Sequence, residues 1–313
     1  MRSEAVILDE PGALSVRALN LVAPGADDVV VETRWSGIST GTEKLFWQGR
    51  MPWFPGHGYP LVPGYEGVGE VVEAGANAGV TVGTRVLVPG ASCYEGARGL
   101  FGASASHVVV PGARVSEVST ALGVDAVLLP LAATAHHAIA ASPHVGQTLV
   151  VGHGVVGRLI ARLLIARGDP APLVWESDPN RRRGAMGYDV IGMDEDPCEA
   201  HATIFDASGD STILDPLVRH LSPKGEIVLA GFYSEPLSFA FPPAFMREAR
   251  FRIAAEFTKA DMDIVRALVD TGALNLDGLI THHRAAASAA DAYQFAFSDP
   301  GCLKMVLDWS DAA

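Results

Sequence analysis

The sequence contains few cysteines, and their spacing argues against both a disulfide framework and a structural zinc lobe. Cys93, Cys198 and Cys302 are the only three among 313 residues, and none belongs to a CxxC pair. A disulfide framework or a structural zinc lobe needs paired or closely spaced cysteines. We therefore expect a protein of the reducing cell interior, with a cytoplasmic location.

Positive charge is also scarce. The chain has 23 Lys and Arg against 36 Asp and Glu, a formal net charge of −13, and its one basic cluster is Arg181 to Arg183. This balance argues against binding to nucleic acid or to an anionic membrane. No run of about 18 apolar residues stands out, and a strand-like segment follows Met1 directly, so neither a membrane span nor a signal peptide is expected.

What the chain does have is apolar residues, at 49% against 19% charged. That composition argues against extended disorder. It favours a large core and a surface with exposed apolar patches. The length suits two domains, and we expect a homo-oligomer.

Residues 5–111 consist of short β segments separated by glycine and proline, which predicts a small barrel-like β domain. After Gly123 the pattern changes to alternating strands and helices, including a strand at 148–151, a helix at about 155–167 and a strand at 173–175. Strand, turn, helix and strand form a βαβ unit of a parallel sheet. We expect one domain at 121–257, inserted between 1–120 and a tail at 258–313 that returns to the first part.

The segment Gly152-His-Gly-Val-Val-Gly157 is a GxGxxG motif between that strand and that helix. Gly152 suits a tight turn, Gly154 lets the backbone approach a pyrophosphate, and Gly157 lets helix and sheet pack closely. The phosphates then lie at the helix N-terminus. The sequence therefore predicts a Rossmann domain, that is, a doubly wound parallel sheet in an α/β fold. Expected cofactor-binding residues are Gly152, Gly154, Val155, Val156, Gly157, Glu176, Arg181, Thr134, Ser208 and Gly231.

Glu176 follows the next strand, about 20 residues beyond the motif. A carboxylate there can accept hydrogen bonds from the adenosine ribose and repel a 2′-phosphate, which favours NAD over NADP. Arg181 to Arg183 leave NADP open, because they can meet a 2′-phosphate.

The order of these parts resembles the medium-chain dehydrogenase/reductase superfamily over nearly the whole chain. The match is carried by segments 36–43, 63–75 and 129–137 and by the GxGxxG motif. The resemblance implies a GroES-like β-rich catalytic domain around the Rossmann domain. Zinc members of that superfamily have cysteines and a histidine where this chain has Thr40 or Ser39, Tyr65 and a residue near Pro130. Only Glu66 remains, so no catalytic zinc is expected.

Segment 38–66, together with 129–137, more closely resembles the 3-hydroxyethyl bacteriochlorophyllide a dehydrogenase family. That resemblance implies NAD-dependent oxidation of a 1-hydroxyethyl group on a tetrapyrrole ring to an acetyl group, in bacteriochlorophyll synthesis. Without a metal, the alcohol proton must pass to side chains. Thr42, Tyr65 and Thr40 are the expected relay, with His137 as its terminal base. Alternatively, these hydroxyls only cap turns, and the histidine is only packed.

Aromatic residues make up only 7% of the chain, yet several gather between residues 46 and 59. A flat macrocycle needs flat apolar walls, which these aromatic rings can supply. Alternatively, the rings only pack within the protein. His57 can reach a ring magnesium, and Arg50 can pair with a propionate. Expected substrate contacts are Trp47, Arg50, Trp53, Phe54, His57, Tyr59 and Glu66.

Two other functions fit the same features. One is a zinc-independent quinone or enone reductase that uses NAD(P)H, against which Glu176 argues. The other is a nicotinamide-binding protein without catalysis, against which the relay hydroxyls and the aromatic segment argue.

Overall fold

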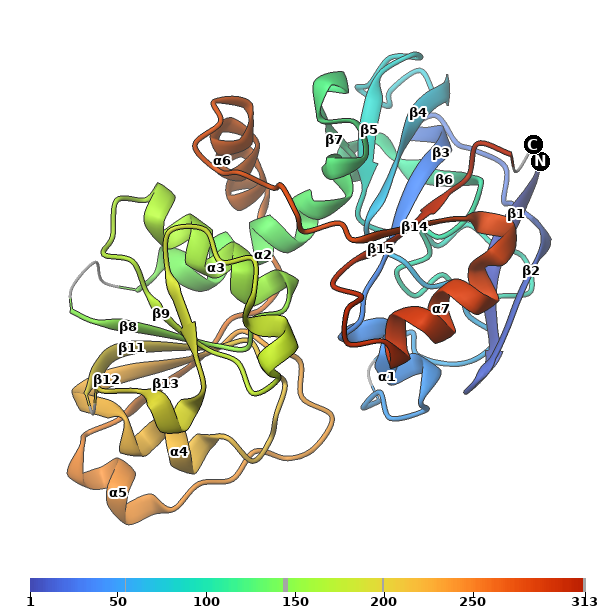
Figure 1. The fold of residues 1–313 in the computed structure, drawn as a ribbon. Helices are drawn as coiled ribbons and strands as arrows, with labels where there is room; N and C mark the ends of the chain where they lie inside the picture. Colours follow the sequence, from blue (N-terminus) through green and yellow to red (C-terminus); the bar gives the residue numbers. More distant parts are fainter. Residues whose placement is uncertain (54, 143–145, 199, 312–313) are drawn as a thin grey trace. The chain divides into compact units, whose positions relative to one another are not determined.

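The computed structural model describes residues 1–53, 55–142, 146–198 and 200–311. The chain forms two compact units: unit 1 comprises Met1–Pro130 and Leu279–Ala313, and unit 2 comprises Leu131–Gly278 (Figure 1). The division expected from the sequence lay at 121 and 257. Helix α6 (Lys259–Asp270) belongs to unit 2, where its Asp261 accepts hydrogen bonds from two histidines of α2 (Leu129–Ala140).

Unit 1 is built on a seven-stranded sheet with the order β14-β15-β3-β4-β5-β7, in which β6 also pairs with β3. The central strand β3 buries Val29, Val30 and Val31 completely. Strand β15 pairs antiparallel with β3, so the C-terminal tail completes the first sheet. The strands are β3 (Asp28–Ile38), β4 (Gly67–Ala74), β5 (Arg85–Val88), β6 (His107–Pro111), β7 (Ser116–Glu117), β14 (His282–Ala285) and β15 (Met305–Asp308).

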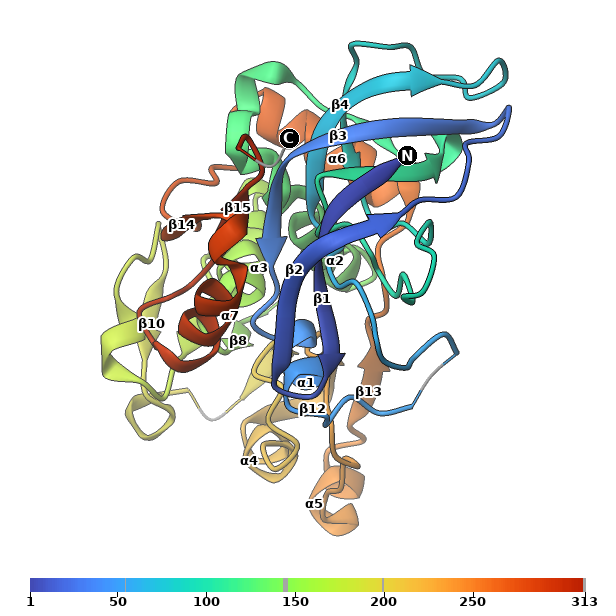
Figure 2. The ribbon, with the colours of Figure 1, turned by 90° about the vertical axis from the view of Figure 1, so that its right-hand side faces the viewer.

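A hairpin and several short helices surround this sheet (Figure 2). The hairpin joins β1 (Arg2–Glu10) to β2 (Ala13–Asn20). Its tip lies beside the turn after α1 (Thr42–Trp47), where a Cβ on Gly49 would meet Pro11 at 2.9 Å. The other helices of unit 1 are η1 (Gly112–Arg114), η2 (Thr120–Leu128), η5 (Ala286–Ser288) and α7 (Ala289–Ser298).

Unit 2 contains a six-stranded sheet whose strands are all parallel, in the order β10-β9-β8-β11-β12-β13. This is the Rossmann order, and the predicted fold class is confirmed. Helices α2 and α3 lie on one side of the sheet, and α4 and α5 lie on the other (Figure 1). The elements are β8 (Thr148–Val151), α3 (Val155–Ala166), β9 (Leu173–Trp175), η3 (Pro179–Arg182), β10 (Asp189–Ile191), η4 (Met193–Glu195), β11 (His201–Asp206), α4 (Leu214–Arg219), β12 (Leu221–Leu229), α5 (Phe241–Met246) and β13 (Arg250–Ile253).

One helical stretch of the described chain, Thr120–Ala140, is long and apolar enough to cross a membrane. It consists of η2 followed by α2, with a kink at Gly123. Because 61% of its most apolar window is buried inside the protein, it also fits the description of a core helix.

A buried ion pair connects three separate segments of unit 1. The Nζ atom of Lys304 donates to Glu66 Oε1 at 2.9 Å, to Glu66 Oε2 at 2.7 Å and to the carbonyl oxygen of Ile38 at 3.2 Å. Lys304 precedes β15, Glu66 precedes β4, and Ile38 ends β3. Lys304 is 1% exposed and Glu66 is 0% exposed, so each charge depends on the other for its solvation.

Replacing Lys304→Met should destabilise the protein by about 3–5 kcal/mol, because it keeps the side-chain volume and leaves Glu66 buried without a cation. Urea unfolding followed by circular dichroism measures the loss. The double variant Lys304→Met/Glu66→Gln should recover part of the stability. A single variant as stable as the wild type would contradict the structural role of the pair.

Candidate functional site

The glycine motif forms the turn between β8 and α3. Gly152 has φ of +92°, a conformation that favours glycine. A Cβ on Gly157 would lie 1.8 Å from the carbonyl oxygen of Gly152, so only glycine fits there. Gly154 is the N-cap of α3, and Val155 and Val156 begin the helix. The turn thus directs the N-terminus of α3 to the edge where phosphates bind in this fold.

Glu176 follows β9 and is fixed against that turn. Its Oε2 accepts a hydrogen bond from the backbone N–H of His153 at 3.0 Å, and its Oε1 accepts one from the N–H of Asp178 at 2.9 Å. The Nε atom of Arg181 lies 4.0 Å from Oε2. The carboxylate is therefore held beside the glycine turn, next to one cationic side chain.

His153, the second residue of the motif, is buried beneath the turn. Its Nδ1 lies 2.7 Å from the carbonyl oxygen of Arg181, and its Nε2 lies 2.9 Å from the hydroxyl of Tyr188. Because the carbonyl can only accept, Nδ1 carries the proton and Nε2 accepts from Tyr188. Burial lowers the pKa of His153 to about 4, so the ring is neutral near pH 7.

A buried arginine on α3 fixes the basic segment that follows Glu176. The Arg158 guanidinium donates to the carbonyl oxygens of His153 at 3.0 Å, Gly184 at 3.0 Å and Arg183 at 2.7 Å. The sequence analysis missed Arg158, His153 and Tyr188. Two arginines on an otherwise apolar helix were the only available signal.

The other expected cofactor residues of the sheet gather at its carboxyl edge. Asp206 ends β11 and accepts from the N–H of Ser208 at 2.9 Å, and its carbonyl oxygen accepts from the N–H of Gly231 at 2.9 Å. A Cβ on Gly152 would lie 3.1 Å from the Cα of Ser208, so these loops adjoin the glycine turn. Thr134 lies on α2. Nucleotides bind at this edge of parallel sheets.

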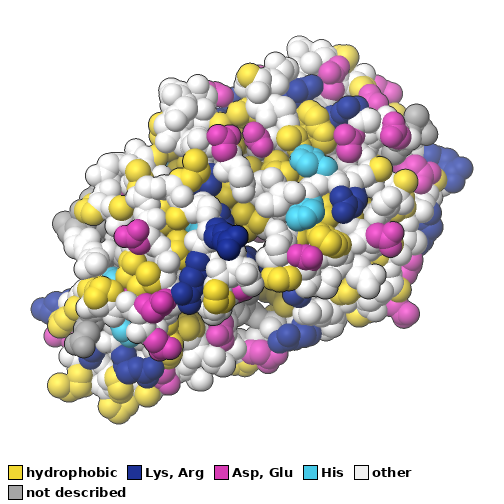
Figure 3. Space-filling model, in the orientation of Figure 1, with side chains coloured by type: hydrophobic (Ala, Val, Ile, Leu, Met, Phe, Trp, Pro, Cys, Tyr) yellow, Lys and Arg dark blue, Asp and Glu magenta, His cyan; other side chains and the backbone are white. Residues whose placement is uncertain are grey.

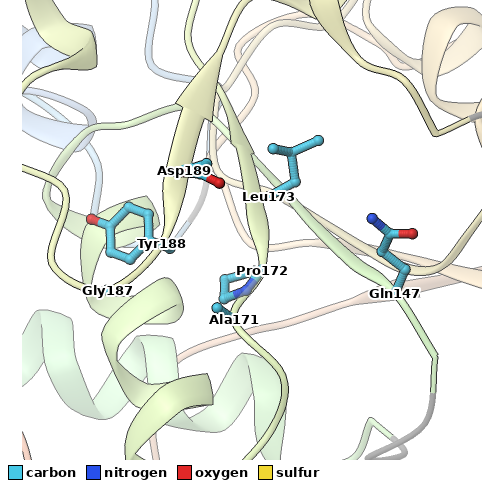
Figure 4. A pocket seen from close by; sticks show the side chains of 7 residues that line it. All are labelled: Gln147, Ala171, Pro172, Leu173, Gly187, Tyr188 and Asp189. Carbon is cyan, nitrogen blue, oxygen red and sulfur yellow. The ribbon is translucent and has the colours of Figure 1, made fainter.

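An open depression of about 380 Å³ lies at the opposite edge of the same sheet (Figure 4). Its lining includes Gln147 before β8, Leu173 at the start of β9 and Asp189 at the start of β10. These are the amino ends of the strands, so this depression is not the nucleotide site.

In unit 1, two of the expected relay residues share one partner. The hydroxyl of Tyr65 donates to Ser39 Oγ at 2.7 Å, and the backbone N–H of Thr42 also donates to Ser39 Oγ, at 3.3 Å. Burial, and then the neighbouring Glu66, raise the pKa of Tyr65 above its usual value. Thr40 belongs to the same turn. Ser39, weighed in the sequence only as a substitute for a metal ligand, is the centre of this group.

Glu66 was expected to contact the substrate. Instead it is fully buried, and both of its carboxylate oxygens accept from Lys304. The expectation failed because the sequence did not reveal Lys304 as its partner. Through Lys304, Glu66 is connected to the carbonyl oxygen of Ile38, the residue that precedes Ser39.

The aromatic segment from the end of α1 to Tyr59 is partly packed and partly open. Trp47 contacts Phe297 with ring centroids 6.0 Å apart, and the hydroxyl of Tyr59 donates to the carbonyl oxygen of Phe46 at 2.6 Å. The ring of His57 lies 5.7 Å from that of Tyr59. Trp53 is 79% exposed. Arg50 belongs to the same segment, and Phe54 lies outside the described residues.

His137, the expected terminal base, lies in unit 2. Its Nδ1 lies 3.0 Å from Asp261 Oδ2, while Nδ1 of His136 lies 2.8 Å from Oδ1 of the same carboxylate. The hydroxyl of Thr258 also donates to Asp261, at 2.6 Å. Burial alone would raise the pKa of Asp261, but the hydrogen bonds outweigh it and lower the pKa, with the largest of these contributions from Thr258. The shared carboxylate leaves Nε2 of His137 as the ring atom that does not face Asp261.

Comparison with known proteins identifies the fold and the family. Residues 25–120 match the alcohol dehydrogenase GroES-like domain. Over all 313 residues the chain is 53% identical to 2-desacetyl-2-hydroxyethyl bacteriochlorophyllide A dehydrogenase of Rhodobacter capsulatus, covering 100% of both chains. It is 54% identical to the protein of the same name from Cereibacter sphaeroides, again covering 100% of both. The chain belongs to this dehydrogenase family.

The solved structures agree on the fold. An alcohol dehydrogenase from Escherichia coli, complexed with NADH, superimposes with a TM-score of 0.84 at 23% identity, covering 98% of this chain and 99% of that one. A dehydrogenase from Sinorhizobium meliloti bound to NADP gives 0.83 at 21% identity, with the same coverage. The identity with the two bacteriochlorophyllide dehydrogenases confirms the family predicted from segments 38–66 and 129–137, and the chain is a dehydrogenase.

Proposed function

We propose that this dehydrogenase oxidises the hydroxyethyl substituent of a bacteriochlorophyllide to an acetyl group in bacteriochlorophyll a synthesis. The observation that carries the proposal is the identity of 53% and 54%, over the full chain, with two dehydrogenases named for that substrate. Unit 2 holds the nicotinamide dinucleotide, and unit 1 supplies the relay hydroxyls. When bound, the nicotinamide accepts the hydride from the carbinol carbon.

We propose NAD rather than NADP as the oxidant. The Glu176 carboxylate is fixed by two backbone N–H groups, so it is placed to accept hydrogen bonds from ribose hydroxyls and to repel a 2′-phosphate. Arg181, the nearest cation, lies 4.0 Å from this carboxylate. Its charge is therefore partly offset by Glu176, which reduces its attraction for a 2′-phosphate.

We propose that no zinc takes part. Ser39, Thr40 and Tyr65 offer hydroxyl oxygens instead of the thiolate and imidazole ligands that zinc prefers, and Glu66 is paired with Lys304. Among the residues that the structure describes, no group of three or more His, Cys, Asp and Glu could hold a metal ion. This donor set does not fit zinc.

The proton then has to pass through hydroxyl groups. Tyr65 donates its own hydrogen to Ser39, which leaves lone pairs on the phenol oxygen to accept the hydrogen of the carbinol. A carbinol attached to a conjugated ring shares the positive charge that develops as hydride departs, so hydrogen bonding can suffice without full deprotonation. Thr42 and Thr40, in the same turn, complete the proposed relay, and His137 is its proposed terminal base.

The segment from Phe46 to Tyr59 is the proposed wall for the macrocycle. Trp53 exposes a broad apolar face, while the packed residues Phe46 and Tyr59 hold the segment in place. Trp47, Arg50, His57 and Phe54 are the other proposed contacts.

The decisive experiment is turnover of the pigment. Purified protein incubated with 3-hydroxyethyl bacteriochlorophyllide a and NAD should shift the red-most absorption band and form NADH, with NAD preferred over NADP. Exhaustive chelation should leave the rate unchanged. Absence of turnover would refute the substrate, a preference for NADP would refute the role of Glu176, and activity restored by stoichiometric zinc would refute the metal-free relay.

Thr42→Val and Tyr65→Phe should each lower kcat on the order of 10²-fold, because each removes a hydroxyl whose hydrogen bond strengthens in the transition state. If both belong to one relay, the double variant should lose less than the product of the two single losses. Single-turnover measurements of NADH formation test this. Wild-type kcat in both variants, together with abolition by His137→Ala, would show that the proton reaches His137 without passing through Thr42 or Tyr65.

We further propose a cytoplasmic homodimer that forms through the edge of unit 2. Strand β13 is a terminal strand of the parallel sheet, and Ile253 on it is 78% exposed. Phe241, Phe245 and Met246 of α5, the helix before β13, are also exposed, and Figure 3 shows apolar side chains at its lower left, where Figure 1 draws α5. A second copy related by a twofold axis would cover the same surface on both chains.

Sedimentation equilibrium should give twice 32.8 kDa, and Ile253→Lys should give the monomer. A monomeric wild type would exclude the dimer.

A further inference from the structure

Unit 1 buries two carboxyl groups near a single amine. Glu43 is 1% exposed and Glu66 is 0% exposed, and Lys304 donates to both oxygens of Glu66. The charged and titratable groups that act on Glu43 are Tyr293, Glu66 and Lys304. One cation compensates one carboxylate, and a second carboxylate away from water is costly unless it takes up a proton.

Glu43 is also connected to the relay. It follows Thr42 on α1, and its Oε1 accepts from the backbone N–H of Ser39 at 3.3 Å. Its Oε2 lies 2.6 Å from the hydroxyl of Tyr293 on α7, which donates to the carboxylate and can accept from the carboxylic acid. Ser39 in turn accepts the hydroxyl of Tyr65. Glu43 therefore ties the relay turn to α7.

We propose that Glu43 is a positioning residue that supports the relay as a neutral carboxylic acid, and that its ionisation sets an alkaline limit on the reaction. The proposal rests on the proposed function for the relay, but the state of Glu43 follows from the buried cluster alone. Burial raises the pKa of Glu43 to about 8, which agrees with the count of charges.

The effect on the reaction is electrostatic. To accept the hydrogen of the carbinol, Tyr65 has to pass its own proton to Ser39. Ionised Glu43 would add a second negative charge beside Glu66 and would raise the pKa of Tyr65 further. A higher pKa makes Tyr65 release its proton to Ser39 less readily, so the rate should fall as Glu43 loses its proton to solvent.

The same titration should appear in the stability of the protein without any substrate. Between pH 4.5 and about 8 the unfolded chain has lost the Glu43 proton while the folded chain keeps it. The folding equilibrium constant should therefore fall as pH rises, by up to about tenfold per pH unit, and this contribution should end near pH 8. The pKa of Glu66 is also raised by burial, and its contribution remains in any variant of Glu43.

The test compares wild type, Glu43→Gln and the control Glu70→Gln, which removes an exposed carboxylate of β4. Tm is measured from pH 5 to 9, and kcat with pigment and NAD over the same range. In Glu43→Gln the fall of Tm between pH 5 and 8 should be smaller and the alkaline loss of kcat should disappear. Glu70→Gln should keep both wild-type profiles.

The outcomes separate the two proposals. Absence of pigment turnover by the wild type would refute the substrate, and the Tm profiles would still decide the state of Glu43. Wild-type Tm and kcat profiles in folded Glu43→Gln would overturn the inference. If Glu43→Gln does not fold, Tyr293→Phe decides: it removes a hydrogen bond that lowers the pKa of Glu43, so the alkaline end of the Tm slope should move to higher pH. An unmoved slope would overturn the inference.

Discussion

The pairing of Lys304 with Glu66 is the interaction on which the chemistry of unit 1 depends. It brings a positive charge from the C-terminal segment to the end of β3, at the residue that precedes the Ser39 to Thr42 turn. A buried pair of this kind adds little net stability compared with apolar packing, but it strongly penalises any arrangement that separates its partners. The pair therefore specifies how β3, β4 and β15 come together. It also leaves Glu43 as the carboxyl group without a cation of its own.

Unit 2 uses buried polar groups in a comparable way, with carbonyl oxygens as the partners. Arg158 donates to two segments of backbone, at His153 and at Arg183–Gly184, and His153 bridges the glycine turn to Tyr188. These bonds fix loops that would otherwise be held only at their ends, next to Glu176. A rigid loop loses less conformational entropy when a nucleotide binds.

The features that depend on local pattern could be predicted from the sequence. The spacing of Gly152, Gly154 and Gly157 between an apolar strand and a helix identified the Rossmann unit, because each glycine meets a local backbone requirement. Glu66 and Lys304 are 238 residues apart, and no local pattern links them. The domain boundary shows the same limit, since α6 belongs to unit 2 through side-chain contacts that its own sequence does not display. The family resemblance supplied the substrate, which the residues alone did not.

The insertion of unit 2 within unit 1 has a consequence for the order of assembly. Unit 2 is one continuous segment, Leu131–Gly278, and all of its strands are present once that segment has been synthesised. Unit 1 needs β14 and β15, which come from the last residues of the chain, to complete its sheet and to deliver Lys304. On the ribosome, the nucleotide-binding half can therefore form first, while the Trp35–Ile38 part of β3 lacks its partner β15. Glu66 can gain its cation only after Lys304 and β15 have been synthesised.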